Sequence, residues 1–413
     1  MKRRVVVTGL GAETPIGSGP EELWGGILAG RSGVGIITAF DHSEFSVHIA
    51  AEVNDFDPTR YVSAKEARHL DRFSQFAIAA ASQAVDDSGL DFESEDRERI
   101  GCIWASGIGG LSEFESTHRV LLDKGPRRVS PFFIPKLMIN AASGQIAIRY
   151  GIQGVNFGVA SACASGQHAI GLAFRALQYG EADVVITGGS EATITPTGIG
   201  GFCSLRALSQ RNDEPEKASR PFSSDRDGFV LGEGAGALVL EEYERARKRS
   251  ARIYGEVLGF GMTDDGYHIS APVPEGTMAA RAIELALREA ELPADAVGYV
   301  NAHGTSTPLN DKMETRAIRT AFGSHADKLL VSSTKSQIGH LLGASGAVES
   351  VVTLLALRDQ IVPATINYTS PDPECDLDYV GNEPRPAEFR YAITNSFGFG
   401  GHNVTMAFGN LEG

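Results

Sequence analysis

Cys163 is the residue of this sequence best placed for nucleophilic chemistry. It stands in VASACASGQHAIG, where an apolar run typical of a strand gives way to a run with helical spacing. Free backbone N–H groups and the positive end of the helix dipole favour a thiolate at a helix start. We therefore expect a lowered thiol pKa and a nucleophilic role. The competing interpretation is a small buried structural cysteine, the commoner situation for a lone thiol.

Two histidines are candidate partners for this thiol. His303, in NAHGTSTPLND, follows the end of a predicted strand. His340, in SSTKSQIGHLLGASG, precedes a second helix that opens with Ala-Ser-Gly. His168 lies one helical turn beyond Cys163, and we interpret it as a packing residue. The spacing predicts that His303 and His340 converge on the cysteine.

Buried strands alternate with helices along the chain, which predicts an α/β architecture. The predicted strands cover 5–9, 100–106, 182–189, 236–242, 297–304 and 328–334. The predicted helices cover 74–89, 164–180, 278–290 and 344–359.

Two pairs of segments are alike and occur in the same order, which indicates an internal duplication. Residues 164–177 align with 344–357, and residues 100–107 align with 297–304. We predict two halves, 1–250 with the nucleophilic cysteine and 251–413 with the two histidines.

Composition excludes several classes of protein. The 413 residues carry a formal net charge of −15, which disfavours nucleic-acid binding. Apolar runs are too short for a membrane span. The four cysteines lack CxxC spacing, so a disulfide framework or a four-thiolate zinc site is not expected. VVVTGLGAETPIG lacks the third glycine of a dinucleotide fingerprint. We expect a cytoplasmic enzyme with no cofactor.

Five segments together resemble the β-ketoacyl-[acyl-carrier-protein] synthases of the thiolase-like fold, and the elongating type II enzymes most of all. They are VASACASGQHAIG, RPFSSDRDGFVLGEGAGALVLE, NAHGTSTPLND, SSTKSQIGHLLGASGAVES and NSFGFGGHNVTMAF. The resemblance covers nearly the whole chain. It implies a five-layer αβαβα fold, a homodimer and a Cys-His-His site.

The resemblance also implies the reaction. An acyl chain moves from an acyl carrier protein to Cys163, and malonyl carrier then loses carbon dioxide and attacks the acyl group, which lengthens a fatty acid by two carbons. Backbone N–H groups of Cys163 and Phe399 would bind the tetrahedral oxyanion. Two imidazoles that converge on one enolate oxygen, those of His303 and His340, fit a condensing enzyme. A hydrolase triad would instead have one base held by an orienting acid.

The family pattern assigns further residues around this site. A buried network that orients His340 and the loop is implied for Lys335, Asp311, Glu314 and Glu349. A structural monovalent cation is implied near Asn301, Glu349, Asn395 and Ser396, with no metal required for the reaction. Substrate-binding positions are implied at Ile108, Phe133, Phe202, Thr305, Thr307 and Phe399, with Phe133 reaching across a dimer.

An acidic carrier protein needs a local basic patch on an acidic enzyme. The sequence offers seven cations for this docking patch: Lys65, Arg68, Arg72, Lys124, Arg127, Arg128 and Arg206. Such charge runs are also common on plain solvated faces.

Four positions depart from the family pattern or are unusual within it. Asn310 stands where glycine is common, and asparagine tolerates the positive φ that a glycine turn uses. Gln337 and Ile338 replace a Met-Thr pair beside Lys335, and Trp104 is large for its strand. These positions affect the expected substrate range and leave the reaction class unchanged.

Four alternatives remain open at this point. The same chemistry could serve a polyketide or another specialised pathway. A thiolase would need a second cysteine as base, and FGFGGHN contains none. Cys163, His303 and His340 could instead bind zinc, or the chain could be a scaffold with an inert Cys163.

Overall fold

A single mixed sheet of eleven strands forms the centre of the molecule. The computed structural model describes residues 2–411. The strand order is β11-β10-β14-β15-β9-β1-β8-β7-β5-β6, with β2 paired to β1. The first half contributes β1 (Val5–Thr14), β5 (Ile100–Ala105), β6 (Asn156–Val159), β7 (Val184–Glu191) and β8 (Gly234–Glu242). The second half contributes β9 (Gly255–Asp264), β10 (Val297–Asn301), β11 (Leu330–Ser332), β14 (Tyr391–Gly398) and β15 (His402–Gly409).

The two halves of this sheet have the same topology. Read from the outer edges, β6-β5-β7-β8-β1 corresponds to β11-β10-β14-β15-β9. In each half the two outer pairings are parallel and the two inner pairings are antiparallel. The halves join where Val5–Val7 of β1 pair with Gly255–Val257 of β9. The predicted duplication is thus confirmed, and residue 250 falls between helix α9 (Tyr243–Lys248) and β9.

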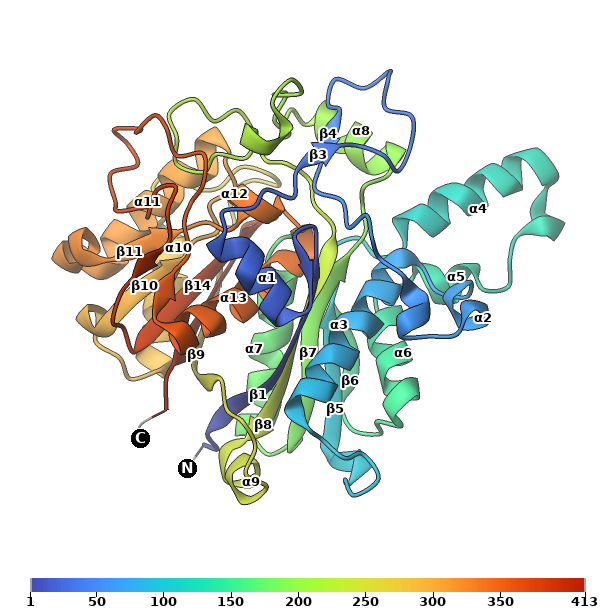
Figure 1. The fold of residues 1–413 in the computed structure, drawn as a ribbon, viewed down its shortest axis with the longest axis horizontal. Helices are drawn as coiled ribbons and strands as arrows, with labels where there is room; N and C mark the ends of the chain where they lie inside the picture. The colour runs from blue at the N-terminus through green and yellow to red at the C-terminus, as the bar shows by residue number, and fades with distance from the viewer. Residues whose placement is uncertain (1, 412–413) are drawn as a thin grey trace.

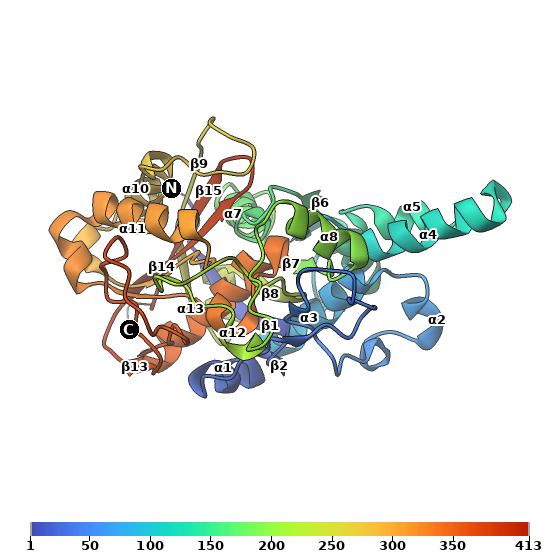
Figure 2. The same cartoon turned by 90° about the horizontal axis from the view of Figure 1, so that it is seen from above.

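Helices cover both faces of each half and complete five layers. Helices α7 (Ser165–Gln178) and α13 (Ser345–Asp359) lie between the two halves of the sheet (Figures 1 and 2). Helices α3 (Arg72–Ser88) and α6 (Ala141–Tyr150) cover the outside of one half. Helices α10 (Thr277–Glu289) and α11 (Pro308–Phe322) form the outer layer beside the other half. The expected αβαβα arrangement is confirmed.

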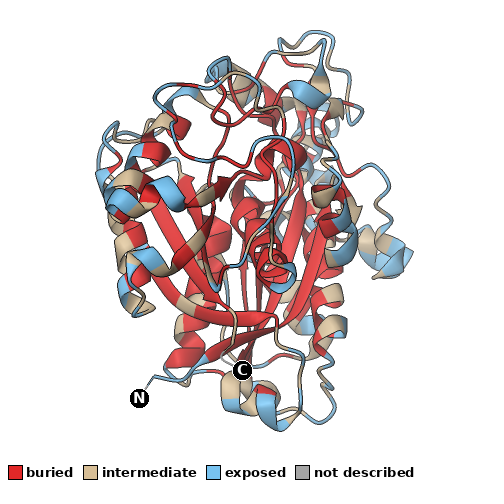
Figure 3. Cartoon of the chain, turned by 60° about the vertical axis from the view of Figure 1, so that its left-hand side comes forward, coloured by how far each residue is buried: buried red, intermediate tan, exposed pale blue. Residues whose placement is uncertain are grey.

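The middle layer is the most buried part of the fold. Every residue of α13 from Ser345 to Leu357 is buried, so this helix has no solvent-facing side. Figure 3 shows the strands and central helices as a continuous buried region beneath exposed outer helices and loops. Residues on α13 are therefore packed on all sides, which favours a rigid site next to them.

Helices α7 and α13 cross at two equivalent glycines. A Cβ on Gly166 would lie 2.8 Å from the Ala347 nitrogen, and a Cβ on Gly346 would lie 3.1 Å from the Gln167 nitrogen. Only glycine permits this backbone approach. The crossing brings the starts of the two Ala-Ser-Gly helices together.

The remaining elements surround this frame. They are α1 (Pro20–Leu28), α2 (Ala64–Ala67), α4 (Leu111–Lys124), α5 (Phe133–Leu137), α8 (Pro196–Ser204), α9 (Tyr243–Lys248), α12 (Lys335–Ile338), β2 (Gly17–Ser18), β3 (Gly35–Ile36), β4 (Ile49–Ala50), β12 (Ile361–Val362) and β13 (Arg385–Pro386). Helices α2, α4 and α5 lie at one end of the molecule, on the right in Figures 1 and 2. Within residues 2–411, no helix is both long and apolar enough to cross a bilayer.

The unusual residues are accommodated without disturbing the frame. Trp104 is fully buried in β5, and its Nε1 donates to Ser190 Oγ at 2.9 Å. Ile338 is part of the main core. Asn310 needs no positive φ, contrary to expectation, because it lies in the first turn of α11 and its N–H donates to the N-cap Thr307.

Candidate active site

Cys163 lies at a tight turn between β6 and α7. Ala162, directly before it, has a left-handed backbone with φ of 49°. Such strain in a non-glycine residue persists where the surroundings enforce it. Gly398 packs closely on the turn, since a Cβ there would lie 3.1 Å from the Cys163 nitrogen. The turn and the Gly398 backbone together fix the position of the thiol.

The thiol of Cys163 is protonated at neutral pH. Burial raises its pKa to about 12, while the charge of Lys335 and the backbone N–H groups of Phe399 and Cys163 oppose the rise. The lowered pKa expected from the helix start is therefore wrong, because burial removes water that would solvate a thiolate. A nucleophilic role for this thiol would therefore need a base that takes its proton during attack.

His340 occupies the position of that base. Its Nε2 lies 3.0 Å from Cys163 Sγ, and its Nδ1 lies 2.9 Å from Ser345 Oγ. Burial and the charge of Lys335 hold the pKa of His340 well below its usual value. The ring is thus neutral, and when Nδ1 donates to Ser345, Nε2 is the acceptor facing the thiol.

His303 faces the same space from the end of β10. Its ring centroid lies 5.4 Å from that of His340, with the planes at 84°. Its pKa is also held well below the usual value by burial, Lys335 and His340. One ligand atom each from Cys163, His303 and His340 lie within 4.8 Å of one another. The structure therefore brings together the three residues singled out in the sequence.

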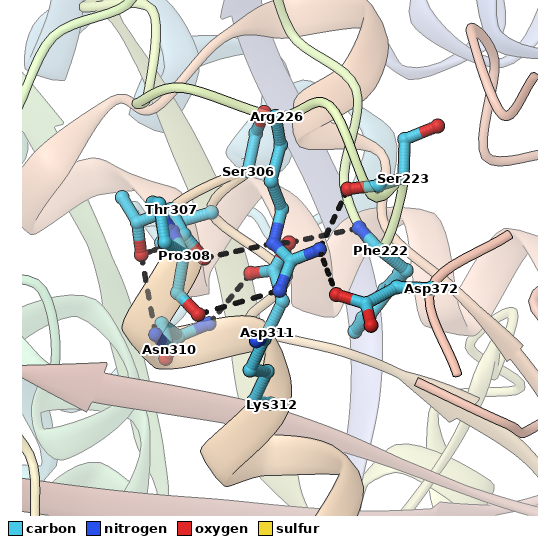
Figure 4. Close-up of polar contacts among 12 residues, drawn as sticks. Phe222, Ser223, Arg226, Ser306, Thr307, Pro308, Asn310, Asp311, Lys312 and Asp372 are labelled. Carbon is cyan, nitrogen blue, oxygen red and sulfur yellow. Dashed lines mark hydrogen bonds and ion pairs between the residues drawn. The ribbon is translucent and has the colours of Figure 1, made fainter. Parts of the chain in front are cut away.

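The charged residues expected to form one network make three separate contacts instead. Lys335 pairs with Glu349, and both side chains are buried. Glu314 accepts the backbone N–H groups of His303 at 2.8 Å and Gly304 at 2.7 Å. Asp311 faces a residue not singled out before, Arg226, at 3.4 Å (Figure 4).

These three contacts act on different parts of the site. Burial raises the pKa of Glu314 to about 7, and the N–H groups of Gly304 and His303 oppose that rise. Asp311 and Glu314 therefore hold the loop after β10, which is one part of the expected role, and neither makes a hydrogen bond to His340 within residues 2–411. Lys335 remains the charge whose field acts on both histidines and the thiol.

A cavity of about 550 Å³ opens onto Cys163, His303 and His340. Its lining includes the expected substrate-binding residues Ile108, Phe202, Thr305, Thr307 and Phe399, and also Arg206. Phe133 is not part of this lining, since it lies at the start of α5. Apart from Phe133, the structure gathers the expected substrate positions around one space.

The seven expected docking cations do not form one uniform group. Lys65 and Arg68 on and beside α2, Lys124 at the end of α4, Arg127 and Arg128 after it, and Arg206 after α8 are exposed. Arg72 differs, because its guanidinium donates twice to Glu233 and once to the Val53 carbonyl. Arg72 is therefore engaged within the chain rather than free for a partner.

Three buried acceptor atoms around Lys335–Glu349 have no hydrogen-bond partner within residues 2–411. They are Asn301 Oδ1, Glu349 Oε2 and Ser396 Oγ. Asn395 is satisfied, since its amide donates to Glu314 and accepts from Thr405. Oxygen acceptors of this kind suit a hard cation, so the residues present fit the monovalent cation considered above.

Glu191 is a buried acid that sequence reasoning missed. Its carboxylate accepts from Ser106 Oγ at 3.0 Å and from the N–H groups of Gly107 at 2.8 Å, Ile108 at 3.3 Å and Gly343 at 3.0 Å. Burial raises its pKa to about 7. It joins the wall of the cavity to the loop after His340. The signal for it was an acid at the end of the apolar run VVITGGSE.

Comparison with known proteins decides the family. A model described as "Beta-ketoacyl synthase, N-terminal domain" matches residues 2–246, and one described as "Beta-ketoacyl synthase, C-terminal domain" matches residues 254–369. The chain belongs to the beta-ketoacyl synthase family.

Full-length relatives within this beta-ketoacyl synthase family carry one name. The chain is 54% identical over 407 residues to "3-oxoacyl-[acyl-carrier-protein] synthase 2" of Synechocystis, with 98% of each chain covered. It is 51% identical over 410 residues to the protein of that name from Coxiella burnetii, with 99% of each covered.

Solved beta-ketoacyl synthases have the same fold. A beta-ketoacyl synthase from Burkholderia phymatum aligns over the whole of both chains with a TM-score of 0.93 and 36% identity. A type II polyketide ketosynthase, solved in complex with its acyl-carrier protein, aligns over both whole chains with a TM-score of 0.91 and 34% identity.

Proposed function

We propose that the chain is a 3-oxoacyl-[acyl-carrier-protein] synthase that elongates fatty acids by decarboxylative condensation. The observation that carries this proposal is the contact of 3.0 Å between His340 Nε2 and Cys163 Sγ at the base of a cavity of about 550 Å³. A neutral base against a protonated thiol suits acyl transfer to sulfur.

In the first half-reaction Cys163 Sγ attacks the carbonyl of an acyl-carrier thioester. His340 Nε2 takes the thiol proton, and the sulfur–carbon bond forms. Backbone N–H groups of Cys163 and Phe399 point at the sulfur, so they are near the oxyanion that develops on the carbonyl. The intermediate collapses, the carrier thiolate leaves with the proton from His340, and Cys163 carries the acyl group.

In the second half-reaction malonyl carrier enters the same cavity. Loss of carbon dioxide leaves an enolate whose oxygen carries negative charge. Neutral imidazoles of His303 and His340 donate N–H bonds to that oxygen, and their low pKa values keep them from binding a second proton. In this step His340 carries its proton on Nε2, and its Nδ1 accepts from the Ser345 hydroxyl. The enolate carbon then attacks the acyl-cysteine, Cys163 leaves as a thiolate that takes up a proton from solvent, and the product remains on the carrier.

Fatty-acid elongation is favoured over a polyketide pathway. Full-length relatives at 54% and 51% identity are named 3-oxoacyl-[acyl-carrier-protein] synthase 2. The polyketide ketosynthase is more distant, at 34% identity. Product analysis with a panel of acyl carriers tests the choice: saturated 3-oxoacyl products lengthened by one unit support elongation, and chains extended repeatedly without reduction contradict it.

The central test follows the acyl group by mass. The protein is incubated with an acyl-carrier thioester, and its intact mass and peptides are measured. We expect one acyl group on Cys163, none in Cys163→Ala, a normal adduct in the matched control Cys203→Ala, and discharge by malonyl carrier. An adduct elsewhere, or none on the folded protein, would contradict the proposal.

The same three side chains could also hold a zinc ion, since their ligand atoms lie within 4.8 Å of one another. Metal analysis of the purified protein distinguishes the two functions. Acylation of Cys163 at full stoichiometry in protein containing no zinc supports the synthase. Stoichiometric zinc that must be removed before Cys163 reacts supports the metal site.

A homodimer is part of this proposal. Strand β6 ends the sheet, and its outer edge has no partner strand within residues 2–411. Large apolar side chains are exposed on and near β6, α4 and α5: Phe157, Ile148, Leu122, Phe132, Ile134 and Met138. Exposed sheet edges and apolar patches are typical of interfaces. Sedimentation should show a dimer that Phe157→Asp weakens, and Phe133 would then lie close enough to serve the partner's cavity.

A structural monovalent cation would be held by the orphaned oxygens of Asn301, Glu349 and Ser396. Its positive charge would offset the buried carboxylate and brace α13, with no part in bond making. Melting temperature in potassium, sodium and a bulky organic cation tests this. A higher melting temperature in one small cation, lost in Ser396→Ala, supports the site, and equal values contradict it.

A further inference from the structure

Arg226 is a buried cation that none of the steps above uses. Its side chain is 2% exposed. Nη1 donates to the Ser223 carbonyl at 2.6 Å and to Asp372 at 2.8 Å. Nε donates to the Thr307 carbonyl at 3.1 Å, and Nη2 donates to the Pro308 carbonyl at 3.3 Å (Figure 4). One guanidinium thus joins three segments that are distant in the sequence.

Asp311 completes this contact from the first turn of α11. One of its oxygens lies 3.4 Å from Arg226 Nε and accepts the Phe222 N–H at 2.8 Å. A guanidinium is planar and reaches several acceptors at fixed angles, which the single ammonium of lysine cannot do. The pair therefore sets both the distance and the angle between the segment at 222–226 and the start of α11.

Residues 220–228 also contact Ser306, which lies between the two threonines that line the cavity. The Gly228 N–H donates to the Ser306 carbonyl at 3.1 Å, and the Arg220 N–H donates to Ser306 Oγ at 3.0 Å. Ser306 has a left-handed backbone with φ of 68°. A serine in this conformation needs outside support, and the contacts from residues 220–228 supply it.

This supported loop presents two hydroxyls to the cavity. Thr305 and Thr307 both line it, and their Oγ1 atoms lie 2.9 Å apart. His303 stands two residues earlier on the same loop. The arm that brings a carrier's thioester to Cys163 contains amide groups, which hydroxyls bind well. Hydroxyls bind such an arm only when the backbone beneath them is fixed.

We propose that Arg226 is a positioning residue that fixes the loop from Thr305 to Pro308 so that its hydroxyls bind the carrier's thioester arm. This inference rests on the proposed synthase function. Arg226 touches neither the substrate nor the reacting atoms. Its effect is expected on KM for carrier-linked substrates and not on the intrinsic reactivity of Cys163.

The test compares two reactions of the same cysteine. Carrier-linked acyl transfer needs the arm, whereas alkylation by iodoacetamide needs only Cys163. Loss of hydrogen bonds of this kind predicts that Arg226→Lys raises KM for acyl and malonyl carriers about tenfold. The alkylation rate should stay within about twofold of the parent, because nothing at the thiol changes. Arg211→Gln is the matched control, since that arginine bonds Asp225 on the same segment and not the 303–308 loop.

A double-mutant cycle shows whether Arg226 acts through the threonines. Thr305→Val removes one hydroxyl without removing a contact of Arg226. If the arginine works by placing that hydroxyl, the combined variant raises KM by clearly less than the product of the two single effects. Independent, multiplicative effects would overturn the inference.

The remaining outcomes are also decisive. An unchanged KM in Arg226→Lys, or an equal loss of alkylation, overturns the positioning role while leaving the synthase intact. Absence of carrier-dependent acylation in the parent protein overturns the proposed function and this inference with it. If Arg226→Lys does not fold, Asp372→Asn removes one anchor of the guanidinium and should raise KM about two- to threefold. An unchanged KM there contradicts the inference.

Discussion

Nε2 of His340 lies 3.0 Å from Sγ of Cys163, although the two residues are 177 positions apart in the chain. Each stands beside the start of one of the two equivalent central helices. The contact therefore joins the duplicated halves at the point where they meet. Both residues are buried, and each precedes one of the two helices of the middle layer.

Alkylation of Cys163 should report its raised pKa. Burial raises that pKa to about 12, so the thiolate fraction keeps growing as pH rises. We expect the iodoacetamide rate to increase from pH 6 to pH 10 with no plateau near 8.5, the region of an exposed thiol. His340→Ala should lower the rate at pH 7 by about tenfold or more. A plateau near pH 7 would contradict the assignment.

Removal of Lys335 should move the acid side of the pH–rate profile. Its charge helps to lower the pKa of His303 and His340, so both values rise in Lys335→Met. The histidines then take up a proton at higher pH, and the acid limb of kcat/KM shifts upward. Lys335→Met alone leaves the buried Glu349 carboxylate without its partner, which costs about 3–5 kcal/mol of stability. The double variant Lys335→Met with Glu349→Gln avoids that cost. If the acid limb of its kcat/KM profile does not move, Lys335 has no electrostatic effect on the histidines.

Glu191→Gln should flatten the dependence of stability on pH. The folded pKa of about 7 exceeds the usual carboxyl value, so this group favours folding most below pH 4.5 and loses that contribution as pH rises to 7. The slope from one such group is at most about 1.4 kcal/mol per pH unit. Urea unfolding of both proteins at pH 5 and pH 7 measures the difference. If the free energy of unfolding depends equally on pH in the parent and in Glu191→Gln, the pKa of Glu191 is not raised by burial.

Charge reversal on α2 should weaken carrier binding. Lys65 and Arg68 are exposed on and next to this helix, where they can attract an acidic partner. The double change to glutamate is expected to raise KM for carrier-linked substrate about tenfold at low salt and less at high salt. Lys248→Glu on α9, which lies apart from α2 in Figure 1, is the matched control. An equal effect of the control would remove α2 from the docking surface.

Much of the fold could be predicted because its signals are local. Apolar runs at 100–106 and 182–189 and the helix at 344–359 are visible in the sequence and occur in the structure as β5, β7 and α13. Convergence of Cys163, His303 and His340 could also be predicted, because equivalent segments of two copies meet in equivalent places.

Properties that depend on distant partners could not be predicted. The raised pKa of Cys163 depends on burial by neighbours from both halves. Arg226 pairs with Asp311, which is 85 positions away in the chain, and the local sequence RDGFVLG does not predict that contact. Glycine is common in the family at position 310, which suggested a turn. Asn310 instead lies in the first turn of α11, which starts at Pro308. Short-range patterns thus indicate elements, and long-range contacts decide charge and orientation.

Helices α7 and α13 approach each other at Gly166 and Gly346, which are equivalent positions in the two copies. An exact repeat would place the same residue three positions before each glycine. Here the residue three before Gly166 is Cys163, and the residue three before Gly346 is Gly343. The two copies therefore differ in side chain at this equivalent pair. One side supplies sulfur, and the other supplies an N–H for Glu191. The second copy offers no thiol at the equivalent position, because that residue is glycine.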